Sequence, residues 1–532
     1  MLDEVILQVK TSPKVPPAEV VSILGRVMSD LNKAVPESSD TALHHGRLGV
    51  LGIVFFVVAA AAPLVGMTGA APVAIVVGNG AAAPGAYLCV GLVLLLFSVG
   101  FGAMGKHITN AGAFFAYVGR GMGISPGVGS AFVSLVAYIA IQLAIYGFFG
   151  GVVGGTMAAT FGIDQPWYVW TILAWVVVTA LSLASVDVGA KVLGVLMTLE
   201  LLSLLTTFIA VVAQGGGPEG VDLNASFNPS NIFVGGLNGA SGIAFAFAFA
   251  SYIGFEATAI YGEEAKDPHR TVPLATYVAI GTIAGIFALT SWAVVSGLGP
   301  SSVVDQTLAI SGGLADPAAV LFHVAETYVG SWLATAMSWL VVSSLFAGLL
   351  AFQNSCARYF YALGRSKVLP QSLSKVNKSG APVNASIVNS VITMIVFIIF
   401  IVQNLDPILN MFFWFSGMTV VAIVWVEFLV CISIIIFFRK NKNLDSRPWN
   451  TLIAPAAAAF FLILGEYLLT SRFGLLAGTV ADGVDPSTQA WGLNLTGWTL
   501  ITLPFVLFVV GTLIGSVRQD KETSDAVSDL LH

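Results

Sequence analysis

Apolar runs of about 20 residues recur along the whole chain, and each is long enough for an α-helix to cross a membrane. Twelve such helices are expected, at residues 48–78, 86–104, 127–158, 167–184, 190–213, 236–262, 271–298, 317–350, 383–402, 408–438, 451–470 and 498–516. Charged residues make up only 9 % of the chain, against about 25 % in soluble domains. The sequence therefore predicts an all-α integral membrane protein that has the lipid bilayer as its partner.

The basic residues test the number and direction of these helices, because cytoplasmic loops carry an excess of Lys and Arg. With twelve helices and a cytoplasmic N-terminus, the inner segments hold 21 of the 22 basic residues, and the outer segments hold only Arg472. One missed or invented helix would invert every later loop and destroy this split. We therefore predict a multi-pass protein of the cell membrane with both termini in the cytoplasm.

Two predicted helices contain residues that interrupt a helix near the middle of the bilayer. The first helix has Pro63, Gly66, Gly69 and Pro72 at its centre, and the sixth has Ser251 and Gly254 there. Transporters use such broken helices to offer free backbone groups to a polar solute. The alternative is that the glycines only let helices pack closely. The matching positions favour breaks in helices 1 and 6.

Three stretches carry a family resemblance. Residues 254–257 read GFEA and residues 262–273 read GEEAKDPHRTVP; residues 357–370 read ARYFYALGRSKVLP, followed by APV at 381–383; and residues 110–119 read NAGAFFAYVG. Together they resemble the signatures of the amino acid–polyamine–organocation (APC) permeases, over roughly residues 45–440. The resemblance implies the leucine-transporter-type fold, in which two inverted repeats of five helices precede two further helices.

The resemblance and the helix positions divide the chain into five parts. They are a cytoplasmic segment 1–47, a first repeat 48–235, a second repeat 236–438, helices 11–12 at 439–516 and a cytoplasmic tail 517–532. The spacing of apolar residues from Val20 to Leu31 suits an amphipathic helix, although a loosely held tail is an equal alternative.

The expected substrate site lies at the two breaks and uses mainly backbone groups. Its predicted residues are Ala62, Pro63, Gly66, Met67, Thr68, Gly69, Phe247, Ala250, Ser251, Tyr252 and Gly254. Amide groups from Thr68 to Ala71 are expected to face a substrate carboxylate, because a helix N-terminus attracts anions. Ala250 stands where many family members have an aromatic gate, so Phe247 or Tyr252 would supply the gate. Gln142, Tyr146 and Trp414 are weaker candidates for the pocket walls.

Carboxyl groups inside a membrane are expensive and are candidates for ion or proton coupling. Glu200 lies where some proton-coupled family members carry a lysine, and Glu256 follows the break in helix 6. Desolvation favours the neutral form of a carboxyl, so Glu200 is the predicted proton site; a structural glutamic acid is the alternative. Glu427 is expected to be mainly structural. Ser343 and Ser344 form a hydroxyl pair that suits Na⁺ coupling instead.

The loops that carry the family signatures mix both charge signs at the cytoplasmic side. Glu264, Lys266, Arg270, Arg358 and Arg365 are therefore predicted to form an inner gate of ion pairs, unless they are merely solvated.

Several function classes lack their sequence signs. A net charge of −6 excludes a nucleic-acid partner, and no metal or cofactor motif stands in the chain: CxxC, HExxH and Walker A patterns are missing. The prediction is a permease that imports a small neutral amino acid or related amine, with H⁺ as the coupling ion. The alternatives are an exchanger, a Na⁺-coupled carrier of another organic solute, or a membrane sensor or enzyme.

Overall fold

A computed structural model describes residues 49–108, 113–184, 190–256, 258, 267–377, 381–486 and 488–517. The predicted amphipathic segment before residue 48 and almost all of the predicted tail lie outside the described residues. Apart from one isolated bridge between Val480 and Leu493, the described residues form helices and loops. The all-α prediction is confirmed for this part of the chain.

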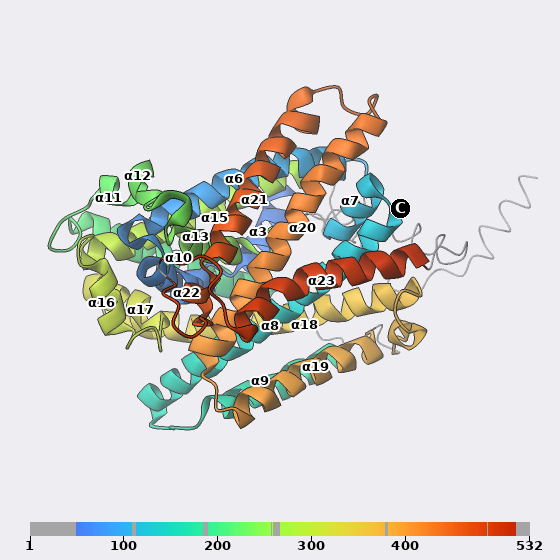
Figure 1. Ribbon diagram of the computed structural model, residues 1–532. Helices are drawn as coiled ribbons and strands as arrows, with labels where there is room; N and C mark the ends of the chain where they lie inside the picture. The colour runs from blue at the N-terminus through green and yellow to red at the C-terminus, as the bar shows by residue number, and fades with distance from the viewer. Residues whose placement is uncertain are drawn as a thin grey trace, which may run out of the picture. The chain divides into compact units, whose positions relative to one another are not determined.

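The first half of the described chain runs from α3 to α12 (Figure 1). Their bounds are α3 Val50–Ala61; α4 Pro63–Val65, η1 Gly66–Ala70, α5 Ala71–Val73 and η2 Ala74–Asn79 in succession; α6 Ala83–Gly105; α7 Ala113–Met122 with α8 Ile124–Phe161; α9 Trp167–Leu183; and α10 Ala190–Ala213. Short helices α11 (Leu223–Phe227) and α12 (Pro229–Ile232) follow α10.

The second half begins with another interrupted region. Its bounds are α13 Ser241–Tyr252, α15 Pro268–Leu298, α16 Val303–Ile310, α17 Ala318–Tyr328, α18 Ser331–Arg365, α19 Val383–Val402, η7 Pro407–Phe412 leading into α20 Phe413–Lys440, η8 Trp449–Ile453 leading into α21 Ala454–Ser471, α22 Phe473–Ala477 and α23 Leu495–Val517. In Figure 1, α9 and α19 run side by side, as do α20 and α21.

Within the described residues, nine helices are long and apolar enough to cross a membrane, and a bent pair made of residues 229–238 and 241–252 would be a tenth. Large apolar side chains cover the outward faces of several of them. Examples that are about half exposed are Leu202 and Ile209 on α10, Ile395 and Ile398 on α19, and Val506 and Leu513 on α23. Such surfaces suit contact with lipid, so the chain is a multi-pass membrane protein.

One predicted helix has different limits in the structure. The expected run 317–350 is divided at Gly330. This residue has a φ of 132°, which favours glycine and is not helical, so α17 ends just before it at Tyr328. The long helix α18 therefore begins at Ser331 and continues to Arg365, about 50 Å in all. The stretch 357–365, expected after the helix, forms its last turns.

A buried set of neutral polar side chains joins α8, α9, α18 and α19. Gln142 Nε2 donates to Gln353 Oε1 (2.8 Å), and Asn389 Nδ2 donates to both Gln142 Oε1 (2.8 Å) and Gln353 Oε1 (2.6 Å). Gln353 Nε2 in turn reaches the hydroxyls of Ser386 (3.1 Å) and Ser390 (3.0 Å). Because buried amides must be hydrogen-bonded, this network fixes the relative positions of the four helices.

Candidate functional site

The first interruption of the chain lies at Ala62, between α3 and α4. Its φ of 43° and ψ of 67° are left-handed, a conformation that alanine rarely adopts. Pro63 explains the break, because a proline disfavours the α conformation in the residue before it and supplies no N–H group. α3 is only 12 residues long, about 18 Å, which is little more than half of a bilayer core.

The break lies at the first of the four expected positions, Pro63, and the helix continues through Gly66, Gly69 and Pro72. From Pro63 to Asn79 the backbone is helical as far as Gly78, and the amide of Ala71 donates to the carbonyl of Gly66. The predicted cradle of amides from Thr68 to Ala71 is therefore inside a helix. The free amides of this helical segment belong to its first turn, at Leu64 and Val65.

The second interruption follows α13, which also has 12 residues. Ile253 is extended, and Gly254 has a φ of 114°, which is accessible to glycine and strained for any other residue. The Gly254 amide donates to Glu256 Oε2 (2.8 Å), and Tyr138 Oη donates to Glu256 Oε1 (2.9 Å). Glu256 is 2 % exposed, so its carboxyl holds the interrupted backbone against α8.

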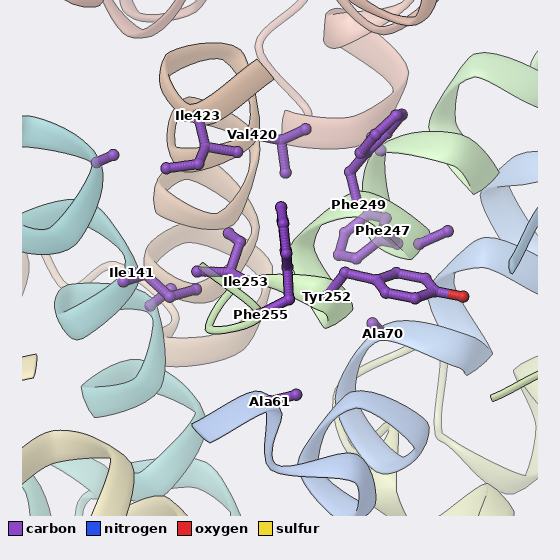
Figure 2. Packing of buried hydrophobic residues seen from close by; sticks show 14 of the residues in the cluster. Ala61, Ala70, Ile141, Phe247, Phe249, Tyr252, Ile253, Phe255, Val420 and Ile423 are labelled. Atoms are coloured by element: carbon purple, nitrogen blue, oxygen red, sulfur yellow. The ribbon is translucent and has the colours of Figure 1, made fainter. Parts of the chain in front are cut away.

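The two interrupted segments meet at Gly66. A Cβ atom at this position would lie 3.2 Å from Ser251 Cβ and 3.3 Å from the ring of Phe287, so a larger residue would push α13 away. Ser251 Oγ donates to the Phe247 carbonyl (2.8 Å) and lies 3.4 Å from Tyr87 Oη. Figure 2 shows Ala61 and Ala70, on either side of Ala62, near the segment from Tyr252 to Phe255.

Tyr252 is held by α6 rather than pointing to the break in the first segment. Its Oη donates to the carbonyl of Tyr87 (2.9 Å), and its ring packs edge-on against Phe287 with centroids 5.3 Å apart. In Figure 2 its hydroxyl points away from Phe255. Of the two aromatic gates expected from the sequence, Phe247 is the one that packs against Phe412 and Phe413.

Four phenylalanine side chains pack together beside Gly69, and we call them the phenylalanine cluster: Phe148, Phe247, Phe412 and Phe413. Phe148 and Phe412 stack with centroids 4.9 Å apart, and Phe247 lies 6.4 Å from Phe412 and 6.0 Å from Phe413. A Cβ on Gly69 would lie 3.1 Å from the Phe412 ring and 3.2 Å from the Phe148 ring. The cluster therefore closes directly onto the helix that follows the first break.

Glu200 joins three segments that are far apart in the sequence. It lies on α10 with 4 % of its surface exposed, and Ser344 of α18 donates its hydroxyl to Glu200 Oε2 (3.2 Å). The backbone amide of Leu64, in the first turn after Ala62, lies near the Glu200 carboxyl. One acid thus links the second half of the broken first segment to α10 and α18.

The other predicted residues have simpler surroundings. Met67 and Thr68 are buried, Thr68 Oγ1 donates to the Leu64 carbonyl (2.8 Å), Ala250 is half-buried, and Ser343 Oγ donates to the Leu340 carbonyl (2.9 Å). The side chains of Arg270, Arg358 and Arg365 are exposed. Glu264 and Lys266, the other two residues of the predicted inner gate, lie outside the described residues.

The three weaker pocket candidates face other parts of the structure. Gln142 belongs to the amide network, Trp414 Nε1 donates to the Ala477 carbonyl (2.7 Å), and the Tyr146 ring packs against Phe397 at 5.1 Å. Their positions in apolar runs did not reveal which face of the helix they occupy.

Sequence reasoning missed Phe148, Phe412 and Phe413 of the phenylalanine cluster, Tyr138 as the partner of Glu256, and Tyr87. One signal was present for two of them: the run Phe412–Phe415 stands just after Pro407, at the start of a predicted helix. No local signal marks Tyr138, because its partner is 118 residues away.

Comparison with known proteins places this chain in a family. The sequence profile of the family described as "Amino acid permease" matches residues 48–515, which is most of the chain. The chain belongs to the amino acid permease family. The APC resemblance is thereby confirmed, and the protein is a membrane transporter of this family rather than an enzyme.

The relatives share low identity over long segments. Cationic amino acid transporter 7 of Arabidopsis thaliana, a chloroplastic protein by its name, is 23 % identical over 80 % of this chain and 74 % of its own length. Amino-acid permease GAP5 of Candida albicans and the histidine permease of Saccharomyces cerevisiae are each 24 % identical over 58 % of this chain, and over 49 % and 52 % of their own lengths.

Proposed function

We propose that this permease imports a small neutral amino acid or related amine across the cell membrane by alternating access, driven by protons. The observation that carries the proposal is the meeting of two interrupted helices at Gly66 and Ser251. Broken helices in this arrangement expose backbone groups to a solute near the middle of the bilayer. In the first turn after the break the Val65 amide would face a substrate carboxylate, because the Leu64 amide lies beside Glu200, and carbonyls near the break would accept from an amino group.

The proposed architecture has twelve transmembrane helices in two inverted five-helix repeats plus two, with helices 1 and 6 broken. The described helices support this number. Residues 63–105 pass as one long helix, although Gly78 interrupts it with a non-helical φ of −96° and ψ of −118°, and α9 is a shorter apolar helix. The described chain has nine helices that are long and apolar enough to span a membrane. If the run 63–105 is divided at Gly78, and α9 and the α13 region are each counted as a span, the number of spans rises to twelve. The distribution of Lys and Arg supports cytoplasmic termini.

The chemistry at the breaks favours a neutral solute. Gly66, Gly69, Ser251 and the phenylalanine cluster carry no charge. Both oxygens of Glu256 accept hydrogen bonds from protein groups, which leaves that acid less free to pair with a cationic side chain. Because a buried unpaired charge is costly, a cationic substrate is disfavoured, even though one relative is named for such substrates.

Glu200 is the proposed site of the coupling proton. Its carboxyl contacts the first turn after the break, so a change in its charge acts on the segment that must move. The alternative, Na⁺ held by Ser343 and Ser344, is less favoured, since the two hydroxyls donate to the Leu340 carbonyl and to Glu200. We further propose that Arg270, Arg358 and Arg365 pair with acids such as Glu264 at the inner gate, beside Lys266.

Uptake into proteoliposomes tests the proposal. Purified protein is reconstituted with an inward proton gradient and offered radiolabelled neutral amino acids, cationic amino acids and amines, with Na⁺ or choline outside. We expect concentrative uptake of neutral amino acids that is independent of Na⁺. Uptake that requires Na⁺, or that is confined to cationic substrates, would contradict it.

The matched variants are Glu200→Gln and Glu326→Gln. Glu326 is an exposed glutamate on α17, so its substitution controls for the loss of one carboxyl. Glu200→Gln is expected to abolish concentrative uptake while leaving exchange of labelled for unlabelled substrate, because exchange needs no net proton movement. Full proton-driven uptake by Glu200→Gln would remove Glu200 from the coupling role.

A further inference from the structure

A further buried acid lies on α20 and has no role in the function proposed above. Glu427 is in the middle of α20 and is 2 % exposed, and its Oε2 atom has no hydrogen-bond partner in the described part of the chain. Both oxygens of Glu256, by contrast, have donors. A buried carboxyl with an unpartnered oxygen is uncommon in a native core and calls for a reason.

Glu427 faces the region of Glu256. α20 packs against α8 beside the partner of Glu256: Thr419 Oγ1 of α20 donates to the Ala137 carbonyl (3.4 Å), and the next residue, Tyr138, donates to Glu256. Glu427 is eight residues after Thr419 and therefore lies on the side of α20 that faces α8, about two turns further along. The charge of Glu256 acts on Glu427, which places the two carboxyls within electrostatic reach of each other.

The other titratable groups around the pair are weak acids. They are Tyr138 from α8, Cys356 and Tyr359 from α18, and Cys431 one turn from Glu427 on α20. Of the remaining helices that pack against α20, α23 has no titratable residue, α21 has Glu466 and Tyr467 near its far end, α7 has Tyr117 and Arg120, α6 has Tyr87 and Cys89, and α13 has Tyr252. Among the described residues, no cation acts on either carboxyl.

Two adjacent carboxylates without a cation cannot both be ionised in a buried site, because their repulsion adds to the cost of desolvation. Glu256 accepts hydrogen bonds at both oxygens, which suits a carboxylate. Glu427, with an unpartnered oxygen, suits the neutral acid.

We propose that Glu427 and Glu256 share one proton and form a second proton site of the transport cycle, separate from Glu200. In the closed arrangement the proton is on Glu427 and Glu256 is the carboxylate. When the interrupted segment moves and water enters, the O–H bond of Glu427 breaks, the proton passes to water, and Glu427 becomes a carboxylate. It takes up a proton again from the outer side, when the carrier next opens there. This inference rests on the proposed proton coupling.

A path toward one side of the membrane lies next to the pair. The Tyr359 ring is 5.3 Å from the ring of Tyr138, which donates to Glu256, and its buried hydroxyl has no partner among the described residues. Tyr359 also lines a cavity of about 20 Å³ with Phe115, Val128 and Ser366, which is enough space for a water molecule. In the proposed topology this cavity lies toward the cytoplasm, where an imported proton must leave.

The test compares Glu427→Gln with Glu466→Gln. Glu466 is also a buried glutamate within a helix, but no other charge acts on it, so it is a matched control. The first measurement is the ratio of protons to substrate molecules taken up by proteoliposomes. We expect Glu427→Gln to lower this ratio by one proton per substrate, and Glu466→Gln to leave it at the wild-type value.

The second measurement is the infrared band of protonated carboxyl groups, recorded as a difference spectrum on adding substrate. We expect a substrate-dependent band that Glu427→Gln removes and Glu466→Gln keeps. In Glu256→Gln the band should disappear at a lower pH than in the wild type, because the repelling neighbour is gone. This variant also keeps the idea testable if Glu427→Gln does not fold.

The outcomes separate this inference from the proposed function. If the wild-type protein moves substrate without protons, proton coupling is wrong, and the inference fails with it. If the wild type is proton-coupled and Glu427→Gln keeps the same proton ratio and the same infrared band, only the second proton site is overturned.

Discussion

Replacing Gln353 by methionine removes the centre of the amide network while keeping nearly the same side-chain volume. Gln353 accepts from Gln142 and Asn389 and donates to the hydroxyls of Ser386 and Ser390. These contacts join α18 to α8 and α19. The four helices α8, α9, α18 and α19 would then lose the network that holds them as one frame.

The expected cost follows from which partners stay satisfied. Asn389 Nδ2 keeps its bond to Gln142 Oε1, and the Ser386 and Ser390 hydroxyls keep Ser182 and Thr179. The two lost bonds to hydroxyls cost about 0.6 kcal/mol each, the average between membrane helices. One N–H of Gln142 Nε2 and one N–H of Asn389 Nδ2 lose their acceptor, at about 1–3 kcal/mol each. The free energy of unfolding should therefore fall by about 3–7 kcal/mol.

The assay is unfolding of the purified protein by titration with SDS in detergent micelles, followed by tryptophan fluorescence. Gln403→Met is the matched control, because Gln403 is exposed at the end of α19. Combining Gln353→Met with Gln142→Leu should cost less than the sum of the two single changes, since both remove the same bond. The reasoning is refuted if Gln353→Met costs no more than Gln403→Met.

Three further predictions concern other parts of the chain. Gly69→Ala should lower the apparent melting temperature, by overpacking worth about 1–3 kcal/mol, and Phe412→Leu should restore part of the loss; no restoration would contradict the contact. Glu466→Met should raise the free energy of unfolding by about 1–3 kcal/mol, because both carboxyl oxygens are buried without a partner among the described residues; an unchanged or lower value would show that this acid has a partner. The Arg447 guanidinium, with hydrogen bonds of 3.0 and 2.8 Å, holds the pKa of Asp445 well below its usual range, so the stability it contributes is complete above about pH 5 and is lost as pH falls through the lowered value. The difference in melting temperature between wild type and Asp445→Asn should accordingly be constant near neutral pH and shrink in acid; a difference that grows in acid would contradict the sign.

The membrane-spanning character of the chain could be predicted from the sequence because it depends on local quantities. A run of apolar residues is compatible with lipid by its own composition, and the backbone hydrogen bonds of a helix are made within the run itself. The limits of α9, α10 and α19 accordingly agree with the expected runs within one or two residues. The end of α17 at Gly330 was missed because one glycine in an apolar run carries little information until its φ is known.

The two interruptions lie close to the positions expected from the sequence. The backbone amides left without a partner inside the helix are not the expected ones. Pro63 and Gly254 act through their own geometry, so both were visible in the sequence. The helix restarts at Pro63 rather than after Gly66, however, and this moves the amides without a partner inside the helix from Thr68 to Leu64 and Val65. The sequence has four helix-breaking residues in this run, at 63, 66, 69 and 72, and nothing in it shows which of them interrupts the helix.

Long-range pairing was beyond local reasoning. Glu200 was selected because an acid in an apolar helix is expensive. Its contacts with Leu64 and Ser344, and the reach of Glu256 to Glu427, join positions more than 130 residues apart in every case. The phenylalanine cluster likewise draws on α8, α13 and α20.

The sequence by itself determined that this chain lies in a membrane, that it resembles the APC permeases and that two of its apolar runs carry helix-breaking residues. Each of these is set by local composition, by a motif or by the geometry of a proline or glycine. Only the tertiary structure decided which acids lie beside the interrupted segments and which aromatic rings pack on them. Those contacts depend on the rotation of each helix about its axis, which uniformly apolar helices do not encode locally.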